Sequence, residues 1–554
     1  MVKVSKSYLI RQLYLLMFMF VLLLMLTSTL IFVETRVIAF NEKEYYLASM
    51  KLTNTIIGYE DGKKIELPRG TKLIHVGNFD EYAKVEYENS IYLVDYEYLK
   101  PLKKDVVLEE KMYVRTSVTV RKEDGLSLIK KGEEVEIISY KDLQDDGSVS
   151  MYKVSNDKTK GYVYAKYLTD DLEYANSTYT DGIYEIHNRR GDTLGGGAAY
   201  NLDFFPVDKP DIENNEMPEV VRSLYLNGAV IHRVDEYIDA FKDTSINAFV
   251  VDIKDDKMPA YKSEVMKNHS ITNYNRAINT FDRYKTAIEK LNDAGFYTIG
   301  RITVFKDEYF IMDHPDHAII DTRTNKPLVH NSSNWPTPYS REVWEFNVEL
   351  AKEAVLEFGF NEIQFDYIRF PDRINRLERD GHIDLKNRYD EDKAEAVQNF
   401  LIYAKDELRE VGAYISADVF GESSHAYVTA YGQYFPAISN VVDAISPMPY
   451  PDHFSMYEYG ISKPVWTVPY EVLSTWGRFT NLRQKETPTP AKVRTWIQAY
   501  DAIRSPRVKY DNEMIEKQIK ALFDNDLDGG FMTWNAASSL SRYISYKEAF
   551  EREY

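Results

Sequence analysis

The chain has 554 residues, with 68 Lys and Arg against 87 Asp and Glu, so its formal net charge is −19. An acidic balance argues against nucleic acid as a partner, because a phosphate backbone is bound by a basic surface. The absence of cysteine excludes disulfide frameworks, thiolate metal sites and cysteine nucleophiles, and the length predicts several domains.

The first predicted element is a transmembrane helix over residues 13–33, after a cytoplasmic tail of residues 1–12. This nearly continuous apolar stretch is long enough, at about 1.5 Å per residue, to cross a hydrocarbon core of about 30 Å. A cleaved signal peptide is the alternative, but the stretch leads into Glu34 and Arg36 instead of small residues. The positive-inside rule predicts a single-pass cell-membrane protein whose C-terminal bulk is extracytoplasmic, since the stretch follows Lys3, Lys6 and Arg11.

Two small β-rich modules are predicted next, over residues 52–102 and 110–170. Each has short alternating strands around a glycine turn, at Gly70 and at Gly132, which is typical of small all-β barrels. The pair resembles bacterial SH3-like modules, and this resemblance implies a cell-wall glycan or peptide as a partner. The alternative is a pair of spacers between the membrane and a catalytic domain. Residues 171–218 are polar and rich in glycine and proline, so they are predicted to be a linker.

Residues 219–545 show apolar runs that alternate with amphipathic helical patterns, several of which end at a glycine in the C-cap position. Eight strands alternating with helices predict an α/β fold, the (β/α)8 TIM barrel. A doubly wound sheet would need a glycine-rich phosphate loop, which Leu226–Ala229 does not provide. The predicted strands are 222–228, 248–254, 297–304, 362–370, 414–419, 444–448, 495–500 and 530–534.

The predicted catalytic pair is Asp366 with Asp418, at the ends of the fourth and fifth strands, where the active sites of such barrels lie. Strand alternation places Gln364 on the same face as Asp366. Because adjacent strands are about 4.8 Å apart, the two carboxyls should converge at a separation that glycoside hydrolysis uses, about 5–5.5 Å for retention or about 6.5–9.5 Å for inversion. Two such acids would also push their pKa values apart, leaving one ionised and one protonated. The alternative is that either aspartate is a buried ion-pair partner of Lys254, Arg301 or Arg369.

Other side chains at the strand ends are predicted to bind substrate, and Glu422 among them competes with Asp418 as the acid/base. Aromatic rings around paired carboxylates favour a carbohydrate cleft, because sugars pack their flat C–H faces on such rings. The predicted substrate-binding residues are Asp252, Lys254, Arg301, Gln364, Arg369, Glu422, Tyr450, Gln498 and Trp534.

Several segments of residues 220–545 resemble, in order, the bacterial putative glycoside hydrolase family that is classed as a domain of unknown function. The clearest are Asn247–Asp256, Arg301–Asp307, Phe360–Pro371, Ser416–Gly421 and Ile445–Pro451. The resemblance implies a TIM barrel related to the α-amylase-like and similar glycosidases. In those enzymes an aspartate ending strand four is the usual nucleophile and a carboxylate ending strand five the usual acid/base, and these roles fall on Asp366 and Asp418.

No metal or other cofactor is predicted. Residues 524–529 begin like a calcium loop, but Asn535 stands where an EF-hand needs glutamate. His314 and His317 belong to a predicted turn that needs no zinc. The absence of a Gly-x-Ser-x-Gly elbow argues against an esterase of the α/β-hydrolase type.

The sequence therefore predicts a membrane-anchored, extracytoplasmic glycoside hydrolase that acts on a cell-envelope or secreted polysaccharide. The alternative from another class is a non-catalytic glycan-binding or wall-scaffolding protein on an inactive barrel. Both carboxylates of the predicted pair are present, which favours the enzyme.

Overall fold

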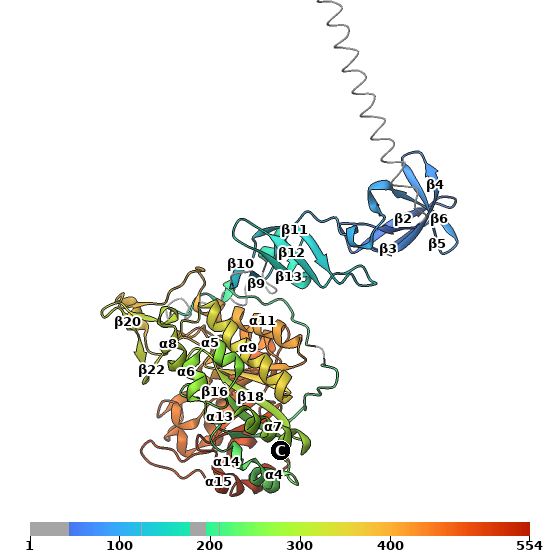
Figure 1. Ribbon diagram of the computed structural model, residues 1–554. Helices are drawn as coiled ribbons and strands as arrows, with labels where there is room; N and C mark the ends of the chain where they lie inside the picture. Colours follow the sequence, from blue (N-terminus) through green and yellow to red (C-terminus); the bar gives the residue numbers. More distant parts are fainter. Residues whose placement is uncertain (1–43, 123–124, 178–194, 210) are drawn as a thin grey trace, which may run out of the picture. The chain divides into compact units, whose positions relative to one another are not determined.

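The computed structural model describes residues 44–122, 125–177, 195–209 and 211–554, and it divides into two compact units (Figure 1). The first unit comprises the described residues up to Arg115 together with Gly132–Ala175, and the second comprises Thr116–Lys131 and the described residues from Asn176 to Tyr554. The predicted transmembrane helix over 13–33 lies outside the described residues. Within the described ranges, no helix combines the length and apolarity needed to span a bilayer.

The first unit contains two antiparallel sheets, in agreement with the predicted β-rich character of this region. In each, alternate residues point into a small apolar core, which explains the alternating sequence pattern. One sheet has the order β3-β2-β6-β5-β4-β1-β7, with β1 Glu44–Leu47, β2 Thr53–Gly58, β3 Lys64–Pro68, β4 Lys72–Phe79, β5 Tyr82–Tyr87, β6 Ser90–Asp95 and β7 Leu99–Lys100. The other has the order β13-β12-β11-β8-β14, with β8 Lys111–Val114, β11 Glu134–Lys141, β12 Met151–Ser155, β13 Lys160–Tyr164 and β14 Leu168–Thr169.

A hairpin from the predicted second module belongs instead to the second unit. Its strands, β9 Val118–Lys122 and β10 Gly125–Ile129, pair with each other. Arg121 donates hydrogen bonds to Glu345 at 2.5 Å and to the Tyr403 hydroxyl at 3.1 Å, on helices α9 (Arg341–Phe358) and α11 (Lys393–Arg409). The apolar side chains of the hairpin are buried there, namely Val118, Val120, Leu126 and Leu128.

The second unit is built on a nearly closed parallel barrel, and this confirms the predicted α/β barrel (Figure 1). Neighbouring strands pair in parallel and the last returns to the first. The seventh strand is interrupted at Arg494, so that its first part pairs with the sixth strand and its second part with the eighth. The strands are β15 Val221–Leu226, β16 Ala248–Asp255, β18 Tyr297–Thr303, β23 Glu362–Asp366, β25 Tyr414–Phe420, β26 Ala444–Met448, β27 Lys492–Val493 with β28 Thr495–Gln498, and β29 Gly530–Trp534.

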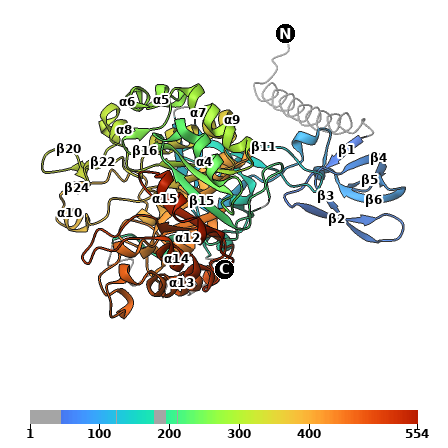
Figure 2. The ribbon, with the colours of Figure 1, turned by 90° about the horizontal axis from the view of Figure 1, so that it is seen from below.

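Amphipathic helices separate the barrel strands and surround them (Figure 2). Side-chain caps begin several of them: Thr280 accepts from the Arg283 amide, and Ser340 from the Val343 amide. Gly359, with φ 74°, ends α9 in the left-handed conformation that favours glycine. Besides α9 and α11, the helices between strands are α4 Val234–Phe241, α7 Phe281–Asp293, α12 Phe435–Val441, α13 Pro469–Glu486 and α14 Asn512–Phe523, followed by α15 Leu540–Ile544 and α16 Lys547–Glu551.

Shorter elements lie in the connections between the barrel strands. They are β17 Met258–Pro259, α5 Glu264–His269, α6 Ile271–Arg276, α8 Glu308–Asp313, β19 Ile320–Asp321, β20 Lys326–Pro327, β21 Val329–His330, β22 Ser333–Asn334, α10 Asn375–Arg379 and β24 Ile383–Asp384; α2 Leu172–Asn176 precedes the barrel region.

Part of the predicted linker over 171–218 packs on the barrel instead. Leu202 and Phe204 are buried in a cluster with Val428 and other residues of the second unit. Gln398 on α11 both accepts from the backbone N–H of Asp203 and donates to its carbonyl, each at 2.7 Å. The burial of these apolar side chains therefore fixes part of a stretch that its glycine and proline content predicted to be a linker. Residues 178–194 and 210 of this stretch lie outside the described residues.

Candidate active site

Arg301, on β18, is surrounded by carboxylates from the neighbouring strands. Its Nη1 donates to Oδ1 of Asp252 at 2.7 Å, and its Nε and Nη2 donate to Oδ2 of Asp366 at 3.1 and 2.5 Å. Oδ2 of Asp418 lies 3.8 Å from the same Nε. These side chains meet because alternate residues of adjacent parallel strands point into the barrel at its carboxyl end. The structure thus brings the predicted pair, Asp366 and Asp418, together.

The contacts of Arg301 also limit the separation of the two carboxyls. Oδ2 of Asp366 and Oδ2 of Asp418 lie 3.1 and 3.8 Å from one nitrogen, so they are at most about 7 Å apart. This limit on one pair of oxygens is compatible with the separations of retaining glycosidases and lies at the lower end of the inverting range.

Asp366 is held by donors on both oxygens. Its Oδ1 accepts the Tyr367 backbone N–H at 2.6 Å, and its Oδ2 accepts both bonds from Arg301. Tyr367 has φ 52°, a left-handed conformation that costs a residue other than glycine about 1–3 kcal/mol. This strain accompanies the turn that aims the Tyr367 amide at the carboxylate, so the backbone and Arg301 together fix its orientation.

Asp418 is in a different environment. Its Oδ1 accepts the indole N–H of Trp496 at 2.7 Å, whereas its Oδ2 has no hydrogen-bond partner among the described residues. The side chain is 1% exposed. Burial, followed by the charge of Asp366, raises the pKa of Asp418 well above its usual range, and the charge of Arg301 offsets this only in part. The site therefore favours the protonated form of Asp418.

Asp252 faces the barrel interior behind Arg301 and is absent from the residues that line the cavity described next. It accepts hydrogen bonds from Arg301 and from the Tyr225 hydroxyl. Burial raises its pKa to about 6, although the charge of Arg301 opposes the rise. Asp252 thus contacts the guanidinium that holds Asp366 and is placed to act through it.

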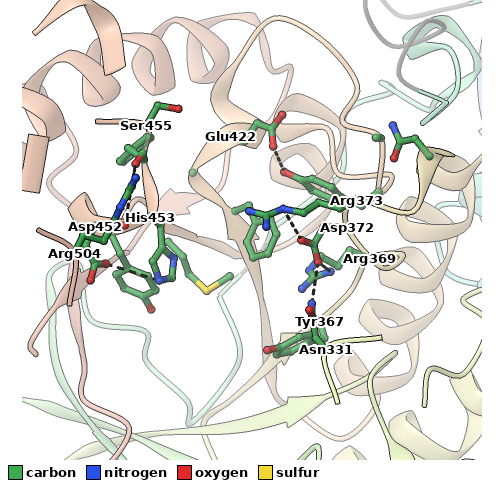
Figure 3. Close-up of a pocket in the computed structure, with 18 residues that line it drawn as sticks. Asn331, Tyr367, Arg369, Asp372, Arg373, Glu422, Asp452, His453, Ser455 and Arg504 are labelled. Atoms are coloured by element: carbon green, nitrogen blue, oxygen red, sulfur yellow. Dashed lines mark hydrogen bonds and ion pairs between the residues drawn. The ribbon is translucent and has the colours of Figure 1, made fainter. Parts of the chain in front are cut away.

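A cavity of about 140 Å³ lies above the paired carboxylates. Arg301, Asp366 and Asp418 line it, and aromatic side chains make up much of the rest. It shares lining residues with a wider cleft of about 990 Å³, and Figure 3 shows the residues of that cleft. The shared residues are Tyr367, Arg369, Phe420, Met448, Tyr450 and His453.

Besides Arg301, four residues of the predicted binding set line one or both of these spaces: Arg369, Tyr450, Trp534 and Glu422. Glu422 lines only the wider cleft. Arg369 and Tyr450 border both spaces, and Trp534 borders the small cavity, with its ring 5.4 Å from the guanidinium carbon of Arg301. The carboxylate of Glu422 accepts hydrogen bonds from the hydroxyls of Tyr427 and Tyr431 at 3.1 and 3.0 Å.

Another three predicted binding residues lie outside both spaces. Lys254 is buried and donates to Asp307 at 2.7 Å, because a register shift after Asp252 turns it away from the cavity. Gln364 is buried deeper in the barrel, where it donates to Ser446 at 3.1 Å. The side chain of Gln498 accepts from the Asp452 backbone N–H at 3.1 Å, so it supports the wall of the cleft without lining it.

The sequence prediction missed His453 and Arg504, which line the wider cleft from the loops after β26 and β28. Pro449 and Pro451 around Tyr450 were the local signal for a loop at the first of these positions. As for metals, none of the described ranges contains a group of three or more His, Cys, Asp or Glu side chains placed to hold an ion.

Together these features define a parallel α/β-barrel protein with a buried acidic centre at the carboxyl ends of its strands. Residues 223–540, more than half of the chain, match the family described as "Putative glycosyl hydrolase domain". The chain belongs to this family, as its sequence motifs predicted. A search of the curated proteins gives no match.

Solved structures similar to the chain include a hypothetical protein from Ruminiclostridium thermocellum ATCC 27405, which is 32% identical over 35% of this chain and 97% of that one, with a TM-score of 0.30. Another is the glycoside hydrolase domain of PgaB (BpsB) from Bordetella bronchiseptica, 12% identical over 59% of this chain and 99% of that one, with a TM-score of 0.42. A class V chitinase from Pseudomonas fluorescens Pf-5 is 11% identical over 60% and 100% of the two chains, with a TM-score of 0.38.

Proposed function

We propose that this protein is a glycoside hydrolase in which Asp366 is the nucleophile or electrostatic stabiliser and Asp418 the acid/base. The observation that supports this best is the contrast between two carboxyls in one aromatic-lined cavity. Asp366 forms an ion pair with Arg301, while Asp418 is buried with a raised pKa and has one oxygen without a hydrogen-bond partner among the described residues. Glycoside hydrolysis needs such a pair, one ionised and one protonated.

In the proposed reaction, the proton on Oδ2 of Asp418 passes to the glycosidic oxygen as the bond to the anomeric carbon breaks. The carboxylate of Asp366 stabilises the positive charge that develops on the sugar, or bonds to the anomeric carbon. Trp496 holds Oδ1 of Asp418 and thereby leaves Oδ2 for the substrate. The aromatic walls exclude water and pack against the sugar ring.

Glu422 remains the competing acid/base. It lines only the wider cleft, and its two oxygens accept hydrogen bonds from tyrosine hydroxyls. Asp418 and Asp366 lie 3.8 and 3.1 Å from the same nitrogen of Arg301, whereas no hydrogen bond or ion pair among the described residues links Glu422 to Arg301 or to Asp366. These positions favour Asp418 as the acid/base.

The proposed substrate is a cell-envelope or secreted polysaccharide, met outside the cytoplasm by a protein anchored through residues 13–33. The proposal for the modules over 52–102 and 110–170 is that they bind cell-wall glycan or peptide, or act as spacers. This part rests on the sequence patterns. Protease added to intact cells should remove the barrel and leave the N-terminal tail protected. A mature protein in the medium that begins near Phe40 would contradict the anchor.

The activity is tested by incubating the full-length protein with purified cell walls and with exopolysaccharides. Mass spectrometry should detect oligosaccharides released by the wild type and not by Asp366→Asn. If the wild type binds a polysaccharide and releases nothing, the alternative of a non-catalytic glycan-binding or scaffolding protein is favoured.

A further inference from the structure

Arg369 lines both the small cavity and the wider cleft, and part of its guanidinium makes no hydrogen bond with a described residue. The residue is 5% exposed. Its Nη1 donates to the Phe370 carbonyl at 3.1 Å and lies 3.4 Å from Asp372, whereas Nε and Nη2 make no hydrogen bond with any described residue. Aromatic rings fix it in place, with centroids 4.4 Å away for Phe420 and 4.9 Å for Tyr367. A buried cation therefore offers free N–H donors to whatever occupies the cleft.

Arg504 is a second cation in the lining of the wider cleft, and no described carboxylate forms an ion pair with it. Its Nη1 donates to the backbone carbonyls of Asp452 and Phe454, and its guanidinium lies 4.5 Å from the ring centroid of Trp466. Figure 3 shows Arg504 and Arg369 on either side of the pocket. The two guanidinium groups thus approach the cleft from different walls, each held by backbone and aromatic contacts.

The acidic residues of the same cleft already have donors. Asp372 lies between Arg369, Arg373 and His330, at 3.4, 3.7 and 3.6 Å. Asp452 is buried and accepts from the Tyr500 hydroxyl at 2.8 Å. The carboxylate of Glu422 accepts from Tyr427 and Tyr431, as described above. Each of these carboxylates is therefore already bound by donors, and the side chain of Arg373, which pairs with Asp372, is 91% exposed.

We infer that the cleft binds a polysaccharide that carries anionic groups, with one group at Arg369 and another at Arg504. This inference rests on the proposed function, because it names the class of substrate for the same site. The planar guanidinium fork matches both carboxylate and phosphate oxygens, so the anionic group is a uronate-type carboxylate or a phosphodiester. Arg301 forms an ion pair with Asp366 and Asp418 favours its protonated form, and both reduce the repulsion between the floor of the cavity and an anion.

Calorimetry with the full-length protein tests the inference with three oligomers of similar length: oligogalacturonate for carboxylate, oligo(glycerol phosphate) for phosphate, and cellohexaose as the neutral glycan. One of the two anionic oligomers should bind at least about tenfold more tightly than cellohexaose, and salt should weaken that binding. The better of the two identifies the anionic group. Equal or tighter binding of the neutral glycan would overturn the inference.

The variant Arg504→Gln should lose about tenfold in affinity for the anionic oligomer and leave cellohexaose binding unchanged. Arg507→Gln is the matched control, since Arg507 is an exposed residue of the same loop that lines neither space. Arg369→Gln should show the same selective loss, provided that its thermal transition shows that it folds. Equal behaviour of Arg504→Gln and Arg507→Gln would contradict the inference.

The two proposals can fail separately. Charge-selective binding without any released product would contradict the hydrolase and leave the anionic ligand in place. Release of oligosaccharides from neutral polysaccharides, without preference for charge, would contradict the anionic substrate and leave the hydrolase.

Discussion

Trp496 donates its indole N–H to Oδ1 of Asp418 at 2.7 Å, and Oδ2 of the same carboxyl has no hydrogen-bond partner among the described residues. The two oxygens of one side chain therefore differ: one is held by a hydrogen bond, and the other is buried without a hydrogen-bond partner among the described residues. Because Trp496 comes from β28 and Asp418 from β25, the seventh strand orients an acid that the fifth strand supplies.

Replacing Trp496 with phenylalanine keeps an aromatic ring and removes the N–H donor. The hydrogen bond from Trp496 lowers the pKa of Asp418, so its loss should raise that pKa further. The basic limb of the pH profile of kcat/KM should then move to higher pH, and kcat/KM at the optimum should fall about tenfold because the carboxyl is free to rotate. Trp534→Phe is the control, since Trp534 lines the cavity without a hydrogen bond to either aspartate. The same shift in both variants would argue against the role given to Trp496.

Asp366→Asn should lower kcat by about 10²–10⁴-fold while the fold is kept, because the variant keeps the shape and removes the charge. Asp418→Asn should be less damaging for aryl glycosides with good leaving groups, which need little protonation. Steady-state rates on aryl glycosides and on the polysaccharide check both expectations. A larger loss on the aryl substrates for Asp418→Asn would move the acid/base role to Glu422.

Asp418 also predicts a pH dependence of stability. Its pKa in the folded protein lies well above that of an unfolded aspartate, about 3.9, so the folded state binds the proton more strongly. Its contribution to stability is thus greatest below pH 4 and is lost as the pH rises toward the folded pKa. At pH 7, Asp418→Asn should melt at a higher temperature than the wild type, with the difference vanishing near pH 4. Asp524→Asn is the control, because a hydrogen bond from Lys520 lowers the pKa of that exposed carboxyl and its replacement should give no gain.

The reaction should retain the anomeric configuration. Oδ2 of Asp366 and Oδ2 of Asp418 are at most about 7 Å apart, which leaves little room for a water between the catalytic group and the sugar. Proton NMR of the first product formed, before mutarotation, should show the anomer of the substrate. The opposite anomer would indicate an inverting mechanism and a base other than Asp366.

The barrel should fold without the first unit, but at a lower stability. A fragment of residues 195–554 keeps Leu202 and Phe204 and loses the β9–β10 hairpin, whereas a fragment of 219–554 loses both. Burial of one large apolar side chain contributes about 1.5–3 kcal/mol, so the shorter fragment should be less stable than the longer one by about 3 kcal/mol or more in urea unfolding. Equal stability of the two fragments would show that residues 195–218 act only as a linker, and loss of a cooperative transition in both would contradict an independent barrel.

Local pattern was enough to predict the barrel strands and the convergence of Asp366 and Asp418, since both follow from apolar runs and from period-two alternation. The ion pair between Arg301 and Asp366 was foreseen only as one of several alternatives. The carboxylates around Arg301 come from three other strands, and period-two alternation does not indicate which cation each of them contacts. Lys254 was assigned to the site because alternation was assumed to continue, and a register shift ends it after Asp252. His453 and Arg504 lie in irregular loops, where no periodicity indicates a direction.

The placement of the β9–β10 hairpin determines how the protein behaves after a single proteolytic cut. The chain passes from one unit to the other near residues 115, 131 and 175. The second unit therefore contains Thr116–Lys131, a segment that precedes part of the first unit in the sequence. A protease that cuts once between Ala175 and Gly195 would make two polypeptides, and the first would still carry Val118–Ile129 packed on α9 and α11. Nicked protein should therefore migrate as two bands in denaturing gels and elute as a single species in native chromatography.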